Sequence, residues 1–169
     1  MVEPWLRGTL IDIESVRRQV LHALESARED AEHWCARLDD RQVHSRPGGV
    51  ASVAFHLRHI SASLDRLLTY ADGAQLSAQQ HEEKEDEEAP LGSARDVLED
   101  FRGGIAEAVA RIRSFSPARF EEERFVGRER LPTTLGGLLV HCAEHTQRHI
   151  GQAITTSRIV MAHLGAVSS

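Results

Sequence analysis

Residues 138–153, LLVHCAEHTQRHIGQA, carry three histidines at intervals of four within a helical apolar pattern. Helix positions four apart differ by only about 40°, so His141, His145 and His149 share one ridge. His145 and His149 fall on the same stripe as Leu138, whereas His141 falls at its edge. Burying imidazoles without partners costs free energy, so this stripe predicts that a group inside the protein binds them.

Helical patterns also dominate the rest of the chain. Apolar residues recur at intervals of three and four, the spacing of an amphipathic helix. Thr133 or Thr134 is a suitable N-cap for the last helix. We predict an all-α four-helix bundle in one domain, residues 1–169, because this length suits a single core. The expected helices span residues 10–39, 50–73, 93–112 and 134–164.

Two connecting segments differ in character. Residues 75–91 are rich in glutamate and poor in apolar side chains, which predicts an acidic, solvated loop. Residues 114–134 include a possible short extended or irregular segment, but no strand alternates convincingly over more than a few residues. Within the third helix, Gly103 and Gly104 cost helix stability, and we expect them to permit close helix packing.

A histidine pair four residues apart on a helix can share one metal ion, since the side chains lie on neighbouring turns. His145 and His149 form such a pair, and a third ligand is expected from another helix. The second helix offers His56 or His59, on a flank that also carries Ser52, Ser63 and Tyr70. The HExxH motif of one class of zinc proteases is absent, since Glu144 directly precedes His145.

Composition excludes several classes of protein. A net charge of −6 and a pI near 5.9 argue against nucleic-acid binding, which needs a basic face. No apolar run approaches the roughly 20 residues of a membrane span, and the start lacks the pattern of a signal peptide, so we expect a cytoplasmic location. Cys35 and Cys142 are predicted to be reduced core thiols, with a functional thiol at Cys142 as the less favoured alternative.

Three stretches resemble the DinB/YfiT-like family of four-helix-bundle metalloenzymes: RPGGVAS at 46–52, HLRHISASLDRLL at 56–68 and HTQRHIGQA at 145–153. The resemblance implies a divalent metal, most often zinc or nickel, bound by one histidine of the second helix and the pair on the fourth. By position the ligands are His59, His145 and His149, with His56 as the alternative to His59. His141 is additional to the pattern, as a second-layer group or a wall of the site.

The resemblance also implies activities and partners. Family members include S-transferases and isomerases that use low-molecular-weight thiols, and hydrolases. We therefore expect a metal-dependent S-transferase or hydrolase acting on small molecules, with such a thiol as a candidate second cofactor. The alternative is a non-catalytic metal-binding or small-molecule-binding bundle. Relatives of this type are often dimeric, and Trp5 or Phe125 are candidate interface residues for a homodimer.

Overall fold

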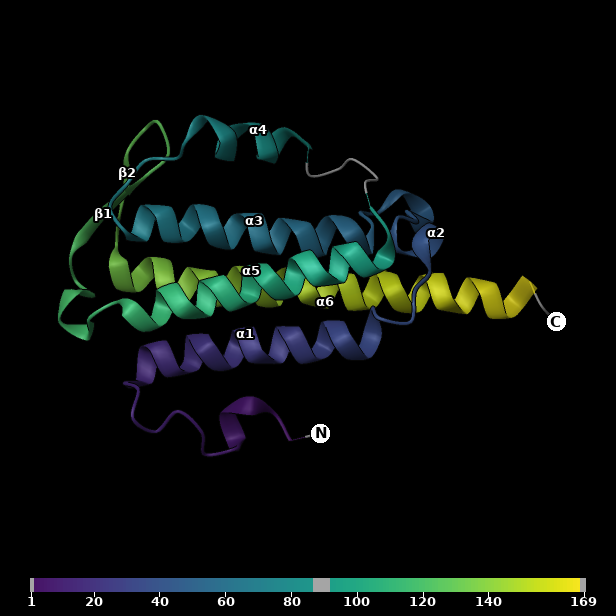
Figure 1. The fold of residues 1–169 in the computed structure, drawn as a ribbon, viewed down its shortest axis with the longest axis horizontal. Coiled ribbons are helices and arrows are strands. Elements are labelled where there is room, and N and C mark those ends of the chain that lie inside the picture. Colours follow the sequence, from purple (N-terminus) through teal and green to yellow (C-terminus); the bar gives the residue numbers. More distant parts are fainter. Residues whose placement is uncertain (1, 87–91, 168–169) are drawn as a thin grey trace.

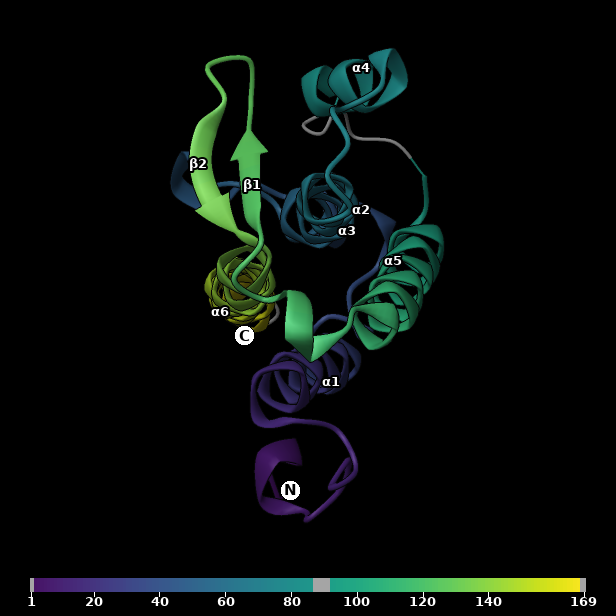
Figure 2. The same ribbon diagram turned by 90° about the vertical axis from the view of Figure 1, so that its left-hand side faces the viewer.

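The computed structural model describes residues 2–86 and 92–167 of the chain. Four long helices run side by side (Figure 1), and the view along the bundle shows them around a common centre (Figure 2). The predicted all-α helical bundle is therefore confirmed. No helix in these two ranges is long and apolar enough to cross a membrane. The long helices are α1 (Ser15–Trp34), α3 (Val53–Ala71), α5 (Ala94–Ser114) and α6 (Leu135–Val167).

Shorter elements connect the long helices. The segment predicted to be extended or irregular contains two antiparallel strands, which pair Glu123 with Thr134 and Val126 with Leu131. This hairpin and the short helix α4 extend from the bundle on the same side, beside α3 (Figure 2). The connecting elements are η1 (Pro4–Leu6), α2 (Asp40–Val43), η2 (Pro47–Gly49), α4 (Ala78–Asp86), η3 (Pro117–Arg119), β1 (Glu123–Val126) and β2 (Leu131–Thr134).

Side-chain caps set the helix ends. The predicted first helix was too long, because the Glu14 carboxylate caps α1 at its start and Asp39 adopts an extended conformation to cap α2. At α3, the Ser52 hydroxyl accepts a hydrogen bond from the Phe55 amide at 3.1 Å. Thr134 is confirmed as a cap of α6, because its hydroxyl accepts from the backbone of residue 137 at 3.0 Å.

The prediction of a loop over residues 75–91 was wrong for α4. Ser77 and Gln80 form a capping box: the Gln80 amide donates to the Ser77 hydroxyl at 3.2 Å, and the Ser77 amide donates to the Gln80 side chain at 2.9 Å. The Gln80 side chain also donates to the Thr69 hydroxyl at 2.9 Å, which joins α4 to α3. Residues 87–91 of the predicted loop lie outside the described residues.

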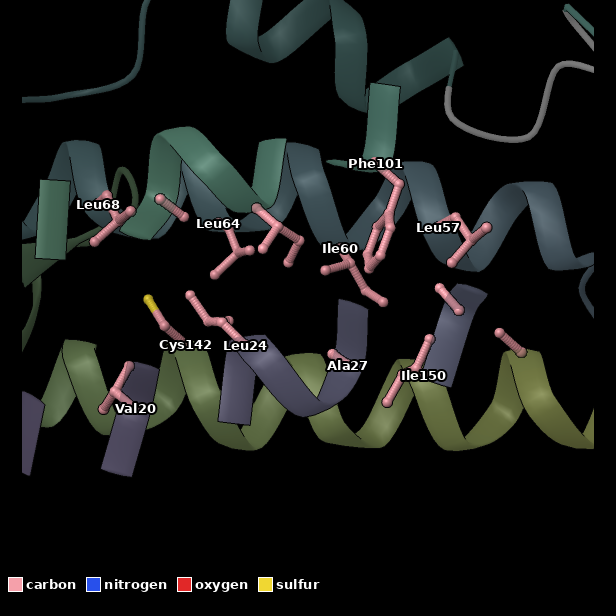
Figure 3. Packing of buried hydrophobic residues seen from close by; sticks show 14 of the residues in the cluster. Val20, Leu24, Ala27, Leu57, Ile60, Leu64, Leu68, Phe101, Cys142 and Ile150 are labelled. Atoms are coloured by element: carbon pink, nitrogen blue, oxygen red, sulfur yellow. The ribbon is translucent and has the colours of Figure 1, made fainter. Parts of the chain in front are cut away.

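The core lies between the four long helices. Leu24 of α1, Ile60 and Leu64 of α3, Phe101 of α5 and Ile150 of α6 are all at most 1% exposed, and they converge in Figure 3. Burying one such side chain contributes about 1.5–3 kcal/mol. This shared core holds α3 firmly against α6, so the two helices that carry His59, His145 and His149 are fixed relative to each other.

A close approach of α5 to α3 occurs at Gly104. A Cβ atom at this position would lie 2.6 Å from the Cβ of Ser61, nearer than side-chain carbons approach in proteins. At Gly103 an added Cβ would meet nothing within 4 Å. The prediction that glycines permit close packing is therefore confirmed for Gly104 and wrong for Gly103.

The two apolar residues suggested for an interface have different surroundings. Trp5 is 54% exposed. Phe125 is half-buried, and the guanidinium of Arg130 lies over its ring at 4.4 Å from the centroid. Of the two, only Trp5 presents an open apolar surface.

Candidate metal centre

Three histidine rings from two helices converge at one point between α3 and α6. His59 comes from α3, while His145 and His149 come from successive turns of α6. One ligand nitrogen from each ring lies within 4.8 Å of the other two. The ring centroids are 5.0 Å apart for His59 and His145, 4.4 Å for His59 and His149, and 4.6 Å for His145 and His149.

The nitrogen spacing suits a metal ion. The Nε2 atoms of His59 and His145 lie 3.4 Å apart. Two imidazole nitrogens bound tetrahedrally at 2.0–2.1 Å from zinc lie about 3.3 Å apart, so this pair already has the separation of two ligands. The group contains the three residues predicted from the sequence, and their role as ligands stays a prediction.

The electrostatics favour the neutral form of His145. Burial, followed by the nearby His149 and His59, lowers the pKa of His145 to about 4. A neutral imidazole keeps a lone pair for coordination, whereas a protonated ring cannot bind a metal. At neutral pH the site therefore presents His145 in the form that binds a cation.

His56, the alternative ligand on α3, lies behind the three-histidine group. It is 5% exposed, and its Nδ1 atom lies 3.1 Å from the Nδ1 atom of His149. One of these nitrogens must donate and the other accept, because burial and the neighbouring rings lower the pKa of His56 to about 4 and leave it neutral. Because His56 contacts the Nδ1 atom of His149, a metal would be bound through the Nε2 atom of His149.

His141 lies at the outer end of the ridge. Its ring centroid is 5.7 Å from that of His145, and its Nδ1 atom lies 3.0 Å from a carboxylate oxygen of Glu144. Glu144 also accepts a hydrogen bond from Arg148. Because His141 is outside the three-nitrogen group but borders it, it fits the predicted role of a wall residue.

A cavity of about 730 Å³ adjoins the group, and His141 and His145 form part of its lining. Ser63 connects the three-histidine group to the cavity, because its hydroxyl lies 3.3 Å from Nε2 of His59 and the residue also lines the cavity. Tyr70, about two turns further along α3, also lines the cavity. Of the polar flank predicted on this helix, Ser52 is absent from the lining because it caps the helix start.

The hairpin forms another wall, and Arg124 holds it in place. This arginine is 7% exposed, and its Nε atom donates to the carbonyl of Ala71 at the end of α3 at 2.6 Å. Its Nη2 atom pairs with Glu122 at 2.9 Å. Hydrogen bonds from Arg119 and Arg124 lower the pKa of Glu122 to about 2, so the pair stays charged at neutral pH.

Comparison with known proteins places this architecture in a family. The family model of the DinB superfamily matches residues 23–153, which include all three histidines. The chain belongs to the DinB superfamily. No curated protein matches the chain.

A solved structure shares this helical bundle. The crystal structure of a conserved protein from Enterococcus faecalis superposes with a TM-score of 0.71 at 17% identity, covering 89% of this chain and 99% of that one. At this identity the likeness shows the fold alone.

The cysteines of this DinB-superfamily chain are both free and buried, as predicted for core thiols. The side chain of Cys142 points into the core beside Leu24 (Figure 3). Burial raises the pKa of Cys142 to about 12, so the thiol stays protonated at neutral pH. Although Cys142 follows His141 in the chain, it is fully buried and is not part of the cavity lining, as expected for a core thiol.

Several lining residues were missed by sequence reasoning. Arg66 lies on the same helix as His59, one turn beyond Ser63, and a helical wheel could have placed it on that flank. His81 and Arg128 come from α4 and the hairpin turn, and only the tertiary fold brings them to the cavity. No local spacing in the sequence indicates that these segments meet.

Proposed function

We propose that this chain is a divalent-metal-dependent enzyme that acts on small molecules, as a thiol-dependent S-transferase or as a hydrolase. His59, His145 and His149 would hold the metal. The proposal is supported by membership of the DinB superfamily, by the three converging rings and by the cavity beside them.

The donor set fits zinc or nickel. Neutral imidazoles suit both ions, whereas magnesium and calcium prefer oxygen ligands. When bound, such an ion supplies a Lewis acid that lowers the pKa of a water molecule or stabilises a thiol as its thiolate.

The observation that carries the enzymatic proposal is the three-membered group next to a cavity. Structural zinc sites are closed by four protein ligands, whereas catalytic sites keep three and leave a position open. Within the described residues the group has three members, and His145 belongs both to it and to the cavity lining. A small molecule in the cavity would therefore reach the open side.

The chain offers two groups for moving protons at the cavity. Tyr70 carries a phenol that can donate, and His141 carries an imidazole oriented by its contact with Glu144. His56, also a candidate from the sequence, is buried against His149 and lies outside the lining, so its contact serves the ring of His149 instead.

The proposal is tested with protein loaded with one equivalent of zinc, nickel or cobalt. Conjugation of cysteine or glutathione to 1-chloro-2,4-dinitrobenzene reports on transfer, and release of nitrophenol from 4-nitrophenyl acetate reports on hydrolysis. We expect one reaction to depend on the metal and to be lost in His149→Ala. In the cobalt protein, a thiolate-to-metal absorption band on adding thiol would identify transfer as the chemistry.

A metal bound at full stoichiometry without metal-dependent turnover in either assay, and without a spectral change on adding thiol, would contradict the enzymatic proposal. That result would favour the non-catalytic metal-binding bundle.

A further inference from the structure

The cavity beside the three-histidine group has walls from four parts of the chain. The lining includes Ser63 and Tyr70 from α3, His81 from α4, Val126 from the hairpin and His145 from α6. Figure 2 shows how α4 and the hairpin both rise beside α3 on one side of the bundle. The cavity volume, about 730 Å³, is in the range of small-molecule sites.

The charged side chains of this cavity are basic. Arg66 and Arg128 line it, and none of its described lining residues is an aspartate or glutamate. This is unexpected in a chain of net charge −6. The local excess of positive charge favours an anionic ligand over a neutral or cationic one.

Arg66 is positioned close to the metal ligands. It is only 9% exposed, and its Nη2 atom donates to the Ser63 hydroxyl at 3.1 Å. The same hydroxyl lies 3.3 Å from Nε2 of His59. One hydroxyl therefore separates the guanidinium from a ring of the three-histidine group, and a short ligand can contact both.

Arg128 faces the cavity from the turn between β1 and β2. Neighbouring arginines are engaged elsewhere: Arg124 pairs with Glu122, and Arg130 stacks on Phe125. Arg128 is exposed and forms no ion pair within the described ranges of the chain. Its guanidinium can therefore bind an anion without first breaking a protein contact.

Three aliphatic side chains form an apolar part of the lining. Leu67 and Leu76 are half-buried side chains from α3 and the segment before α4, and Val126 adds a third from β1. A ligand with an anionic group and an apolar portion therefore matches both the arginines and these side chains.

We propose that this cavity binds a small organic acid, with its carboxylate or phosphate held by Arg66 and Arg128 and its apolar portion against Leu67, Leu76 and Val126. Guanidinium groups bind both kinds of anion through paired hydrogen bonds. The proposal deepens the proposed function, on which it rests, by naming the substrate class of the same site.

The test uses zinc-loaded protein and three probes with the same chain: hexanoate, monohexyl phosphate and uncharged hexanamide, with binding measured by isothermal titration calorimetry. We expect at least one anion to bind about tenfold or more tightly than hexanamide, and the tighter one identifies the preferred group. Arg128→Gln should weaken that anion about tenfold and leave hexanamide unchanged. Arg130→Gln, on the same turn but outside the lining, is the matched control.

Arg66→Gln and Arg66→Lys extend the test to the buried arginine. If these variants fail to fold, Arg128→Gln still decides the outcome, because Arg128 is exposed. Equal affinity for hexanamide and both anions, or anion binding unchanged in Arg128→Gln, would overturn the proposal. Metal content measured on the same samples separates this failure from that of the metal site. Zinc retained at full stoichiometry with no anion preference would refute the substrate class alone.

Discussion

Gly104 tests the packing of α5 against α3 more sharply than any other position. Replacing it with alanine places a Cβ atom 2.6 Å from both Cβ and Oγ of Ser61, and 3.2 Å from its Cα atom. Rotation about χ1 of Ser61 moves its Oγ atom but leaves its Cβ and Cα atoms in place, so a side-chain rotation cannot remove the clash. The helices must move apart.

The matched control is Gly103→Ala, one residue earlier on α5, where the added Cβ would meet nothing within 4 Å. Both substitutions gain the higher helix propensity of alanine, about 1 kcal/mol. Only Gly104→Ala carries the cost of overpacking, typically about 1–3 kcal/mol. The difference between the two variants therefore isolates packing, and we expect Gly104→Ala to be about 1–3 kcal/mol less stable than Gly103→Ala.

Urea unfolding followed by circular dichroism measures this difference, in chelator so that metal binding does not contribute. Gly103→Ala should raise the midpoint above that of the natural chain. A Gly104→Ala variant as stable as Gly103→Ala would refute the close helix contact.

Three further predictions concern the histidines and the buried thiol. His56→Leu should weaken metal binding about 10–100-fold, because it removes the hydrogen-bond partner of His149. His56→Asn keeps a polar atom at this position and should retain most of the metal affinity. Equal losses of affinity in the two variants, measured by competition with a chelator, would argue against a role of His56 in orienting His149. In metal-free protein the free energy of unfolding should fall as the pH is lowered from about 6.5 to 4. The pKa of His145 drops from 6.5 to about 4 on folding, so the unfolded chain binds more protons than the folded protein in this window. A urea midpoint that does not change over this range, or the same pH dependence in His145→Gln, would contradict this prediction. Cys142, with its pKa raised to about 12, should react with a disulfide reagent in urea but not in the native protein, and rapid native labelling would show an accessible thiol.

Much of the fold follows from local sequence. The apolar spacing of three and four residues predicts all four long helices, and the Thr134 cap is readable as well. The errors occur where a capping side chain overrides the pattern. The first helix was predicted to reach residue 39, but α1 ends at Trp34 and Asp39 caps the separate helix α2. The Ser77 and Gln80 capping box starts α4 in an acidic segment that was predicted to be a loop.

The candidate site is predictable only in part. His145 and His149 can be placed on one face from their spacing alone, but the choice between His56 and His59 depends on how α3 is rotated against α6. Geometry separates them, because His59 joins the three-nitrogen group and His56 contacts the back of His149. The rotation of α3 about its axis is set by packing of the whole core, so the sequence of this helix alone does not determine which histidine faces α6.

The cavity could not have been predicted. Its basic character depends on Arg66 and Arg128, which are far apart in the sequence and line the same cavity because Arg124 ties the hairpin to the end of α3. Such a contact depends on one buried hydrogen bond rather than on a periodic pattern, so no helical or strand spacing reports it.

We predict that His59, His145 and His149 together hold one divalent metal ion. Elemental mass spectrometry of the untagged chain, after reconstitution and removal of free ions, tests it directly on single alanine variants of each, with His141→Ala as the control from the same ridge. We predict about one equivalent of zinc or nickel in the natural chain and in His141→Ala, and loss of the metal in the other three variants, with circular dichroism confirming that each is folded. Full metal content in any of those three, or none in the natural chain, would contradict the claim.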